Sequence, residues 1–551
     1  MKKDLNTIIS NINSLLKDKK FKELIDEINI NFDKEKPPVI LNILGGAKIF
    51  QPNATKEDKI SGANDFKEAF QKDNSFINSL INLIRISIEL GDFKDALTLA
   101  KQYEKKFGYQ KDIFRGIARI NFKTGNVKEA VKYLNQVLNK NEGSSTNWTQ
   151  YLIRLNYDYF IDQKEFLKKC IKFSDSLEII DERYLIPIKN EKNKKIKLGF
   201  MSADFRRHPI SYLLLELIKT LDKNKFQTFG ISNTEKKKYD SETEVYKKAF
   251  NVWSDISELT DLEAVNSIRS NNIHVLIHLG GFFDRSRFAV IKNRAAPIQI
   301  SWMNINTTGV KNMDYLIADK NLIKKDEEIN YSEKIIYMPN IWNIHSGFKE
   351  KKLIDSFKES KSDKEITLGS FNNFDKLSDK VILVWSSILN KIKKSKLILR
   401  SSNRMNTEYI YSRFKEFNVN EKIEIQNLIE DESNHLNSYK KIDIALDTFP
   451  TPGMITTFEA LWMGVPVITM KGFNLCSRAG ESIMKNINMK ELICENEEDY
   501  VSKVVELSKN INNLNLIKKK IFFEVKNSRL FNYELFNQEF ETAIINLTKK
   551  N

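Results

Sequence analysis

DTFPTPGMITTFEALWMGVPVITM, residues 447–470, begins where the apolar run KIDIALD (441–447) ends. The run KIDIALD is typical of a buried strand, TTFEALWMG (456–464) of a helix and VPVITM (465–470) of a second buried strand. In such a unit the loop rich in Pro, Gly and Thr lies at the carboxyl end of the first strand. Two interpretations of this loop are open: a connection that needed turn residues and an N-cap, or a cradle for a phosphate.

Strand-like segments alternate with helical stretches from about residue 195 onwards, in two consecutive sets. The first set is IKLGFMSA (196–203), QTFGIS (227–232), IHVLIHLGG (273–281), APIQISWM (296–303), MDYLIAD (313–319) and KIIYMP (334–339). The second set is EITLGSF (365–371), SKLILRSS (395–402), KIEIQN (422–427), KIDIALD and VPVITM. This alternation predicts two doubly wound α/β domains with parallel sheets, joined around residues 345–362. Ligands are then expected at the carboxyl ends of the strands, in the cleft between the domains.

The chain before the charged linker IPIKNEKNKK (186–195) follows a helical pattern and contains a repeat. Gly91 and Gly125 are 34 residues apart, and so are Ala96 and Ala130. This period, with Gly at a turn and Ala at a helix contact, predicts tetratricopeptide-like repeats. Residues 41–75 resemble another repeat with a longer internal loop, and residues 145–178 a degenerate last one. Such a stack is either a surface for a protein partner or a structural spacer.

Length and composition describe a multidomain globular chain. Its 551 residues predict about three or four domains, 41% of them are hydrophobic, and no run of 18 apolar residues suits a membrane span. Asp, Asn and Lys interrupt residues 1–21, which favours an amphipathic helix over a signal peptide. The net charge of +15 comes from 88 basic and 73 acidic residues. Because the lysines are mixed with glutamates in nearly every segment, we expect a solvated surface rather than a site for nucleic acid.

The three cysteines give information on compartment. Cys170, Cys476 and Cys494 are too few for a disulfide framework, and their spacing does not suit a zinc site. We therefore expect the reducing cytosol and a cytoplasmic protein.

The loop after KIDIALD has the residue types that an anion site needs. Gly453 allows close backbone approach, and Thr456 and Thr457 offer hydroxyls and N–H groups at a helix start. Glu459, one turn later, can accept a hydrogen bond from a ribose hydroxyl, and Gly464 is placed to end the helix. Neither GxxxxGK[ST] nor a complete GxGxxG occurs, which excludes the usual mononucleotide and nicotinamide loops.

The five histidines all lie in the α/β part of the chain. His208 stands in SADFRRHPISYLL (202–214), just after a predicted strand and beside a helix start. Asp204, four residues earlier, can orient or charge its imidazole. A structural histidine is the alternative interpretation.

At this point the sequence resembles a known family. The segments LGFMSADFRRHPISYLL, APIQISWM, MDYLIAD, LGSFNNFDKLSDKVILVWSSIL, DIALDTF, EALWMGVPVIT and SRAGESI occur in this order. Together they resemble the catalytic half of the O-linked N-acetylglucosamine transferases, a group that includes bacterial relatives and the plant O-fucosyltransferases. The resemblance implies an α + α/β chain: tetratricopeptide-like helical repeats followed by a GT-B fold of two Rossmann-like doubly wound domains.

The expected domains are the repeats over 1–178, the N-terminal catalytic domain over 190–350 and the nucleotide-sugar-binding domain over 362–525. A C-terminal helix is expected over 526–551. The motifs that carry the resemblance lie within about residues 195–495.

The resemblance also implies roles for single residues. His208 and Asp204 match the histidine and aspartate of the family motif D-F-x-x-H-P in the active site. Lys376 matches the lysine that holds the donor pyrophosphate. His435 matches a histidine that contacts the nucleotide base.

Further matches concern the donor loop. Thr456 matches a threonine of the phosphate loop, and Glu459 stands where the family has an acidic ribose contact. Arg478 matches the arginine of an SR pair after the last strand, and we include it among the donor-binding residues. Gly453 and Thr457 complete this set.

The chain departs from the family pattern at several positions. Met454 and Ile455 replace polar residues of the phosphate loop, and NINTTG (304–309) replaces a Gly-Tyr-Pro-Gly turn. Glu432 stands where a lysine is expected near His435. A family histidine upstream of D-F-x-x-H-P has no counterpart, because no histidine precedes His208. These differences leave two questions open: which sugar nucleotide is the donor, and whether the chain is an active enzyme.

The expected activity is that of an inverting glycosyltransferase. It would move a sugar from a nucleotide sugar, UDP-N-acetylglucosamine or another UDP-hexose, to a protein side chain presented by the repeats. Two alternatives stay open: a catalytically silent repeat scaffold that binds protein partners, and a GT-B enzyme that acts on a surface glycan. We expect no cofactor beyond the donor and no metal, because the sequence contains no Asp-x-Asp pair.

Overall fold

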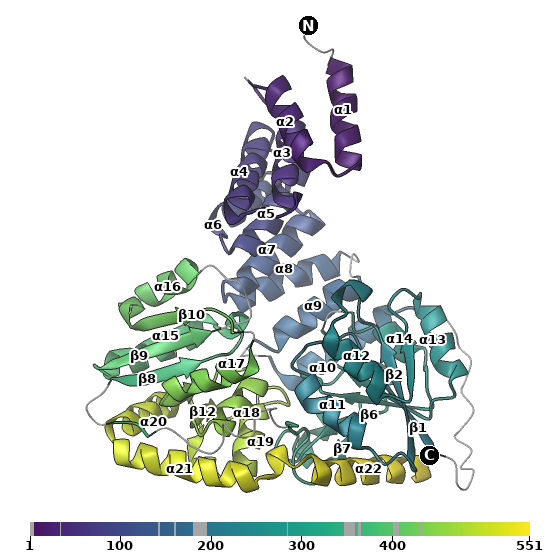
Figure 1. Ribbon diagram of the computed structural model, residues 1–551, viewed down its shortest axis with the longest axis vertical. Coiled ribbons are helices and arrows are strands. Elements are labelled where there is room, and N and C mark those ends of the chain that lie inside the picture. Colours follow the sequence, from purple (N-terminus) through teal and green to yellow (C-terminus); the bar gives the residue numbers. More distant parts are fainter. Residues whose placement is uncertain are drawn as a thin grey trace. The chain divides into compact units, whose positions relative to one another are not determined.

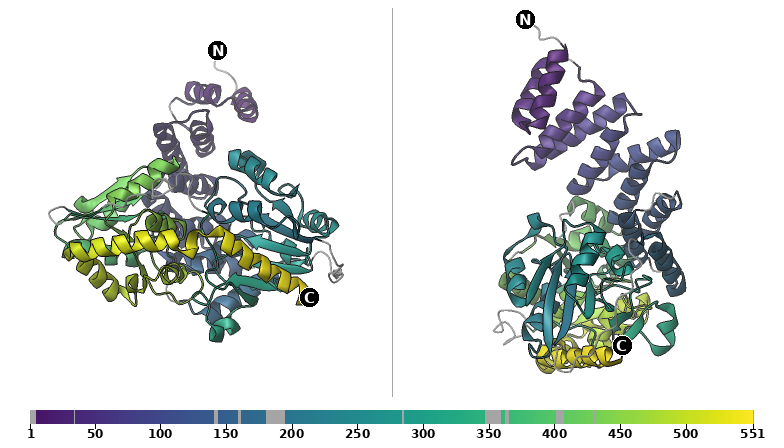
Figure 2. Two further views of the ribbon diagram at one scale, coloured as in Figure 1. Left: turned by 60° about the horizontal axis from the view of Figure 1, so that its bottom comes forward. Right: turned by 90° about the vertical axis from the view of Figure 1, so that its right-hand side faces the viewer.

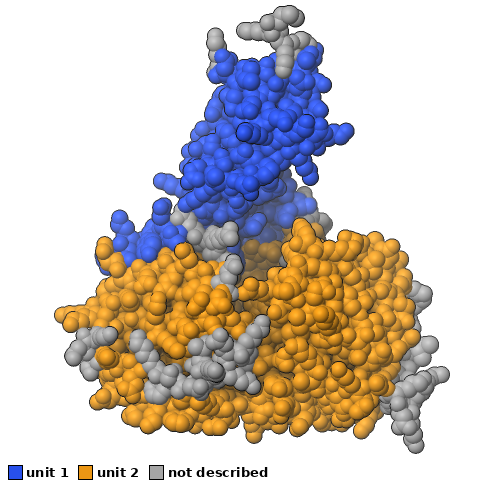
Figure 3. Space-filling model, viewed as in Figure 1, with its two compact units in different colours: residues 1–142, 402–420 blue, residues 143–401, 421–551 orange. Residues whose placement is uncertain are grey.

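The computed structural model describes residues 5–33, 35–140, 144–158, 161–179, 195–283, 285–346, 359–361, 365–400, 407–429 and 431–550. The predicted linker 186–195, apart from Lys195, and most of the predicted join 345–362 lie outside these residues. The chain divides into two compact units (Figure 3). Unit 1 comprises residues 1–142 and 402–420, and unit 2 comprises residues 143–401 and 421–551.

Unit 1 is built from consecutive helix pairs (Figure 1). The helices are α1 (Leu5–Lys17), α2 (Phe21–Asn31), α3 (Pro38–Phe50), α4 (Lys56–Lys72), α5 (Ile77–Leu90), α6 (Lys94–Phe107), α7 (Lys111–Lys123) and α8 (Val127–Asn139). Gly91 and Gly125 turn the chain between paired helices with φ of 73° and 82°, a conformation that favours glycine. Ala96 and Ala130 are fully buried. The predicted 34-residue period is therefore confirmed.

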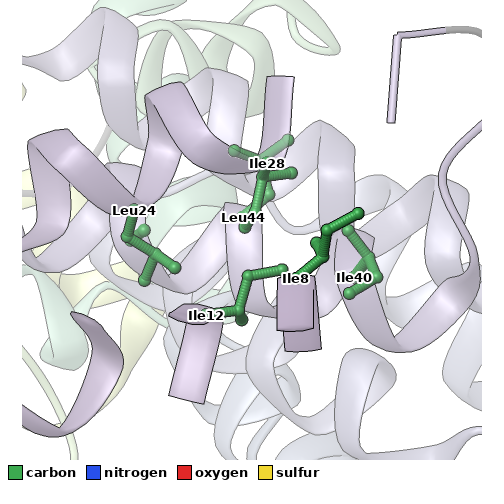
Figure 4. Packing of buried hydrophobic residues seen from close by; sticks show 7 residues of the cluster. Ile8, Ile12, Leu24, Ile28, Ile40 and Leu44 are labelled. Atoms are coloured by element: carbon green, nitrogen blue, oxygen red, sulfur yellow. The ribbon is translucent and has the colours of Figure 1, made fainter. Parts of the chain in front are cut away.

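The first helices of unit 1 share an aliphatic core (Figure 4). Ile8 and Ile12 of α1 pack with Leu24 and Ile28 of α2 and with Leu44 of α3. The apolar side chains of α1 recur at helical spacing, so one face of the helix is buried. The predicted amphipathic helix near the N-terminus is confirmed over Leu5–Lys17.

Unit 1 also contains α16 (Thr407–Lys415), which the sequence places between two strands of the second sheet. The Tyr409 ring packs edge-on against Phe93, with ring centroids 5.4 Å apart. The Tyr409 hydroxyl donates to the Thr124 carbonyl oxygen at 3.1 Å. These contacts lie at the turns of two successive repeats, so α16 belongs to the repeat stack by packing.

Unit 2 begins with the helix pair α9 (Ser145–Leu155) and α10 (Gln163–Ser176), as expected of a degenerate last repeat. Buried polar contacts bind this pair to the first α/β domain. The Lys292 ammonium group donates to the Ser174 and Leu177 carbonyl oxygens at 2.6 and 2.5 Å. A Cβ atom on Gly309 would lie 2.4 Å from Cys170 Cβ, so this turn needs glycine. The repeat pattern thus continues in sequence beyond the unit to which the first helices belong.

The first α/β domain has a parallel sheet in the order β3-β2-β1-β4-β5-β6-β7. Its strands are β1 (Ile196–Ser202), β2 (Phe226–Ser232), β3 (Val252–Asp255), β4 (Val275–Leu279), β5 (Ile298–Trp302), β6 (Tyr315–Ala318) and β7 (Lys334–Tyr337). The helices that connect them are α11 (Ser211–Thr220), α12 (Ser241–Ala249), α13 (Asp261–Ser270) and α14 (Phe288–Lys292). Each predicted strand of this set is present. The edge strand β3 was not predicted, because its four residues are only half-buried.

The second α/β domain has a parallel sheet in the order β10-β9-β8-β11-β12-β13. Its strands are β8 (Ile366–Ser370), β9 (Ser395–Arg400), β10 (Ile423–Gln426), β11 (Ile444–Leu446), β12 (Val467–Met470) and β13 (Ile493–Cys494). Helices α15 (Asp379–Lys391), α17 (Glu432–Ser438), α18 (Ile455–Trp462), α19 (Ala479–Asn486) and α20 (Glu497–Lys509) flank it. Only β13, which is two residues long, escaped the sequence pattern. Two doubly wound domains after helical repeats are thus confirmed.

The C-terminal helices α21 (Ile511–Asn527) and α22 (Tyr533–Lys550) connect the two α/β domains (Figure 2). The ring of Trp302, at the end of β5, stacks on Phe540 of α22 with a centroid distance of 5.3 Å. The Asp222 amide donates to the Glu541 carboxylate at 2.8 Å. The end of the chain therefore packs against the first domain after the second domain is complete.

The described helices include none that is long and apolar enough to cross a membrane.

Candidate functional site

Each sheet of unit 2 has one point where the strand order reverses, and a pocket lies at each of these points. The first lies between β1 and β4, and the second between β8 and β11. Ligands of open parallel sheets bind at such points, beyond the carboxyl ends of the strands. The second pocket is lined by the ends of β8 and β11 and by the first turn of α18.

The loop 447–455 enters α18 without a side-chain cap. Met454 is at the N-cap position and makes no side-chain cap bond, and the helix begins at Ile455. Thr456 and Thr457 therefore lie in the first turn, and both line the pocket. Gly464 ends this element with φ of 70°, as predicted. The positive end of the helix dipole thus borders the pocket, where it favours an anion.

Gly453 gives the loop its close packing. A Cβ atom at this position would lie 2.4 Å from Thr456 Oγ1, 2.8 Å from Thr457 Oγ1 and 3.1 Å from Asn372 Oδ1. Backbone of the loop therefore approaches the threonine hydroxyls more closely than any side chain would allow.

Lys376 lies in the short turn after β8 and faces the same loop. Its ammonium group donates to the Pro452 carbonyl oxygen at 2.6 Å and lies 3.4 Å from Asn372 Oδ1. The same amide oxygen accepts from Thr456 Oγ1 at 3.2 Å. Burial lowers the pKa of Lys376, while the nearby Asp447 acts in the opposite direction. The lysine and the amide come from the turn after β8 and the hydroxyl from the start of α18, and they meet beside the pocket that Asn372 and Thr456 line.

The buried carboxylate of Asp447 accepts hydrogen bonds from the backbone of the loop. Its carboxylate accepts from the Gly453 amide at 2.5 Å, from the Thr448 amide at 3.0 Å and from Thr469 Oγ1 at 2.9 Å. Burial raises the pKa of Asp447 to about 6, because the charged form is poorly solvated. Two of its partners belong to the loop itself, so this carboxylate fixes the loop conformation.

His435 and Glu459 lie together beside the pocket. The imidazole Nε2 lies 3.0 Å from Glu459 Oε2, which also accepts from the Tyr439 hydroxyl at 2.7 Å. Arg400 Nη1 lies 3.5 Å from His435 Nδ1, and its guanidinium group stacks over the Phe371 ring at 4.2 Å. Because the guanidinium group can only donate, it favours the imidazole form with the proton on Nε2. The predicted base and ribose contacts therefore form one hydrogen-bonded cluster.

His208 and Asp204 follow β1 in the first domain. Their nearest side-chain atoms, His208 Nε2 and Asp204 Oδ2, are 3.9 Å apart. Asp204 also accepts from Arg206 Nη2 at 2.9 Å, and the Ile210 amide donates to His208 Nδ1 at 3.3 Å. Burial lowers the pKa of His208, although Asp204 opposes this shift. Because Nδ1 accepts from the Ile210 amide, the neutral ring carries its proton on Nε2, the nitrogen that faces Asp204.

Arg478 lies apart from the second pocket. Its guanidinium group donates to Glu327 of the first domain, at 2.8 Å through Nη2. The remaining bonds go to the Leu322 and Gly472 carbonyl oxygens, each at 3.1 Å. Every nitrogen of this guanidinium group therefore already has an acceptor within the chain.

The structure thus places Thr456 and Thr457 in the lining of one pocket. Lys376 and Gly453 lie next to it through their contacts with Asn372 and Asp447, and His435 lies with Glu459 beside it. Sequence reasoning missed Asn372, Asp447 and the Arg400–Phe371–Tyr439 contacts. Their position in the sequence could have identified them. Asn372, Arg400 and Asp447 all stand at or just after the carboxyl end of a predicted strand, where ligands of such sheets bind. Within the described ranges there is no group of three or more His, Cys, Asp or Glu side chains suited to a metal ion.

Comparison with known proteins identifies relatives of both sequence and fold. The SPINDLY protein of Arabidopsis thaliana, a probable UDP-N-acetylglucosamine–peptide N-acetylglucosaminyltransferase, is 27% identical over 368 residues. That match covers 65% of this chain and 40% of the relative. The SEC protein of the same plant, with the same described activity, is 26% identical over 360 residues, 61% of this chain and 35% of the relative. The chain spans about two-fifths of the length of these curated relatives.

A solved structure, a mutant form of the O-GlcNAc transferase of Thermobaculum terrenum, has the same fold. It superimposes with a TM-score of 0.77 at 22% identity, over 90% of this chain and 94% of that chain. This likeness confirms helical repeats followed by a GT-B fold. The family model described as Glycosyl transferase family 41 matches residues 168–355 and 350–540, well over half of the sequence. The chain belongs to glycosyl transferase family 41.

Proposed function

We propose that this protein is an inverting glycosyltransferase that moves a sugar from a UDP-sugar to a protein side chain. The observation that carries the proposal is the second-domain pocket, where Lys376, Thr456 and the start of α18 converge. UDP-N-acetylglucosamine is the first donor to test, because the relatives SPINDLY and SEC are described as N-acetylglucosaminyltransferases. No cofactor beyond this donor is proposed.

In this proposal the diphosphate lies on the second-domain loop. Lys376, Thr456, Thr457 and backbone N–H groups around Gly453 hold it. Negative charge grows on the diphosphate as the glycosidic bond breaks, so fixed positive charge there stabilises the transition state more than the ground state.

The nucleoside belongs beside this loop, next to His435 and Glu459. Glu459 offers carboxylate oxygens to the ribose hydroxyls, while Tyr439 and His435 hold that carboxylate in place. We assign Arg478 to the contact between domains rather than to the donor, because Glu327 and two carbonyl oxygens already occupy its guanidinium group.

The acceptor hydroxyl or amide group would meet the anomeric carbon from the side of the first domain. Asp204 or His208 is proposed to take its proton, and for His208 this requires Nδ1 to give up its hydrogen bond from the Ile210 amide. Arg206 balances the charge of Asp204. The acceptor attacks the face opposite the leaving diphosphate, which inverts the anomeric centre.

The helical repeats are proposed to present the acceptor, with residues 1–178 as the presenting region. The catalytic regions are 190–350 and 362–525, followed by the C-terminal helix within 526–551. We also propose a cytoplasmic location, since Cys170, Cys476 and Cys494 are all free thiols in buried positions.

A screen of sugar nucleotides by thermal shift tests the donor, and mass spectrometry of co-expressed proteins tests the acceptor. UDP and one UDP-sugar should raise the melting temperature, and the same sugar should be found on a protein side chain. A chain that binds no nucleotide sugar would contradict the proposal.

We expect the transfer to proceed without a divalent metal, because Lys376 and the start of α18 provide the positive charge. The rate in excess EDTA should equal the rate with added Mg²⁺. Loss of activity on chelation and recovery with Mg²⁺ or Mn²⁺ would show that the donor site is built differently.

A further inference from the structure

The pocket of the first domain lies where β1 and β4 diverge, on the same sheet edge as His208. Ser202 and Asp204 line it from the end of β1, Asn233 from the end of β2, and His278 and Gly280 from the end of β4. The pocket is narrow, with room for about one water-sized group. Its position matches that of the donor pocket in the other sheet, but its polar groups are of a different kind.

His278 is a buried residue of the pocket lining, and one of its ring nitrogens has no hydrogen-bond partner among the described residues. Its Nε2 lies 2.6 Å from the Ser286 carbonyl oxygen, which can only accept, so Nε2 carries the proton. Nδ1 is then an acceptor, and it makes no hydrogen bond within the residues that the structure describes. The side chain is 1% exposed, and burial lowers the pKa of His278 to about 4, which keeps the ring neutral.

Asn233 provides a second acceptor of the same kind. Its amide nitrogen donates to the Arg285 carbonyl oxygen at 2.6 Å, which fixes the orientation of the side chain. Its Oδ1 atom is buried and, in the described part of the chain, has no hydrogen-bond partner. A buried acceptor left without a donor costs about 1–3 kcal/mol, so two of them around one pocket need an explanation.

The charged side chains near the pocket are already paired. Arg285 donates to Glu235 at 2.8 Å, and Arg287 donates to Asp261 at 2.8 Å. These pairs leave little net positive charge to attract an anion. The unsatisfied groups are neutral acceptors, which a hydrogen-bond donor without charge would match.

We infer that this pocket receives a neutral hydrogen-bond donor of the substrate, an O–H or N–H group, which donates its one hydrogen bond to His278 Nδ1 or to Asn233 Oδ1. The inference rests on the proposed function and adds a subsite to the acceptor side of the cleft. The hydrogen-bond donor has two sources: a hydroxyl group of the transferred sugar, or a backbone N–H group of the acceptor, since the acceptor's own hydroxyl group gives its proton to the base. In either case the pocket positions substrate next to Asp204 and His208.

The variant His278→Gln tests this inference, since glutamine can keep a donor near the Ser286 carbonyl oxygen and lacks the Nδ1 acceptor. The matched control is His274→Gln at the opposite end of the same strand, where Nδ1 accepts from the Lys197 amide at 3.2 Å. The control should leave the binding and kinetic constants within about two-fold of the parent.

The two sources give different results. If the sugar provides the hydroxyl group, His278→Gln weakens binding of UDP-N-acetylglucosamine by about three- to ten-fold, the range of one neutral hydrogen bond, and leaves UDP binding unchanged. If a backbone N–H group of the acceptor occupies the pocket, both affinities stay unchanged and the KM for a serine- or threonine-containing acceptor rises by a similar factor. Equal constants for His278→Gln and the parent, with every substrate, would overturn the inference.

A second measurement does not depend on the variant folding or on donor turnover. The chain has only five histidines, so selective ¹⁵N-histidine labelling gives few NMR signals. The Nδ1 signal of His278 should move when free N-acetylglucosamine or N-acetylserine amide is added to the parent protein. If neither compound moves it, the pocket holds only water. Failure of UDP to bind the parent would instead contradict the proposed donor site, whatever happens at His278.

Discussion

Asn372 Oδ1 is the atom on which the donor pocket depends most closely, because Lys376 and Thr456 both direct their polar groups to it. The lysine is 3.4 Å away and the threonine hydroxyl 3.2 Å. The sequence identifies Lys376 and Thr456 through a family motif, but nothing in the motif says that one amide joins them. The shared amide depends on the turn after β8, which places Asn372 within hydrogen-bond distance of Thr456 at the start of α18.

Lys376→Ala should reduce sugar transfer by at least about 10²–10³-fold, the usual effect of removing one preorganised group that stabilises a growing negative charge. The fold should persist, since among the residues that the structure describes the ammonium group has two hydrogen-bond partners, Pro452 and Asn372. Single-turnover transfer rates and melting temperatures check both points. Lys380→Ala, which removes a surface ion pair with Glu497, is the matched control and should keep full activity. Transfer by Lys376→Ala at the parent rate would remove Lys376 from the donor site.

The raised pKa of Asp447 predicts that the protein loses stability as the pH rises towards 6. Its pKa in the folded protein is about 6, above the ordinary value of 3.8, because of burial. The folded state then binds this proton more tightly than the unfolded state does. The stabilisation from this group is therefore complete below pH 4 or so and is lost as the pH rises to about 6.

Asp447→Asn cannot ionise, so it should not lose stability in this way. The melting temperature of the variant relative to the parent should rise between about pH 4 and pH 6.5, by the equivalent of up to about 3 kcal/mol. Above that range the difference should be constant. A difference that does not change with pH would show that Asp447 titrates as an ordinary carboxylate.

At the scale of elements, the strand patterns were sufficient to locate nearly all of both sheets. Parallel strands such as β4 and β8 are buried at every residue and mostly apolar, so they stand out against the helices around them. β3 is half-buried at a sheet edge, and β13 has two residues, so neither leaves enough pattern to be recognised. What the pattern could not give was the contact between domains through Arg478 and Glu327, because 151 residues separate the two partners.

The loop before α18 should not tolerate a side chain at Gly453. A Cβ atom there would force Thr456 Oγ1 and Thr457 Oγ1 to move, because both would lie under 3.0 Å away. Gly453→Ala should therefore weaken UDP binding by about ten-fold or more, while changes in melting temperature stay small. Calorimetric titration with UDP measures the effect. Gly46→Ala in α3, where the added methyl group meets no atom within 4 Å, is the control and should bind UDP normally.

At the scale of the whole molecule, sequence and packing divide the chain differently. The repeat pattern predicts one helical region over 1–178, whereas α9 and α10 pack with the α/β domains in unit 2. The repeat pattern predicts which two helices pack as a pair. It does not predict which domain the pair packs against, because that depends on contacts such as that of Lys292 with Ser174, which are 118 residues apart. In the same way, α16 is continuous in sequence with the second sheet and yet packs on repeat residues Phe93 and Thr124.

Removal of residues 1–142 should separate donor chemistry from acceptor presentation. The truncated protein keeps α9, α10 and both α/β domains, so slow hydrolysis of the UDP-sugar should stay within about two-fold of the parent rate. Transfer to protein acceptors should fall by about ten-fold or more, because repeat stacks provide extended surfaces for polypeptides.

Tyr409→Ser should accompany the truncation, since loss of Phe93 exposes the Tyr409 ring. The full-length Tyr409→Ser variant is the control for this substitution. Release of UDP without acceptor and mass spectrometry of modified proteins give the two rates. If the truncated and full-length proteins modify the same proteins at equal rates, the repeats do not present the acceptor, and the α/β domains must recognise it alone.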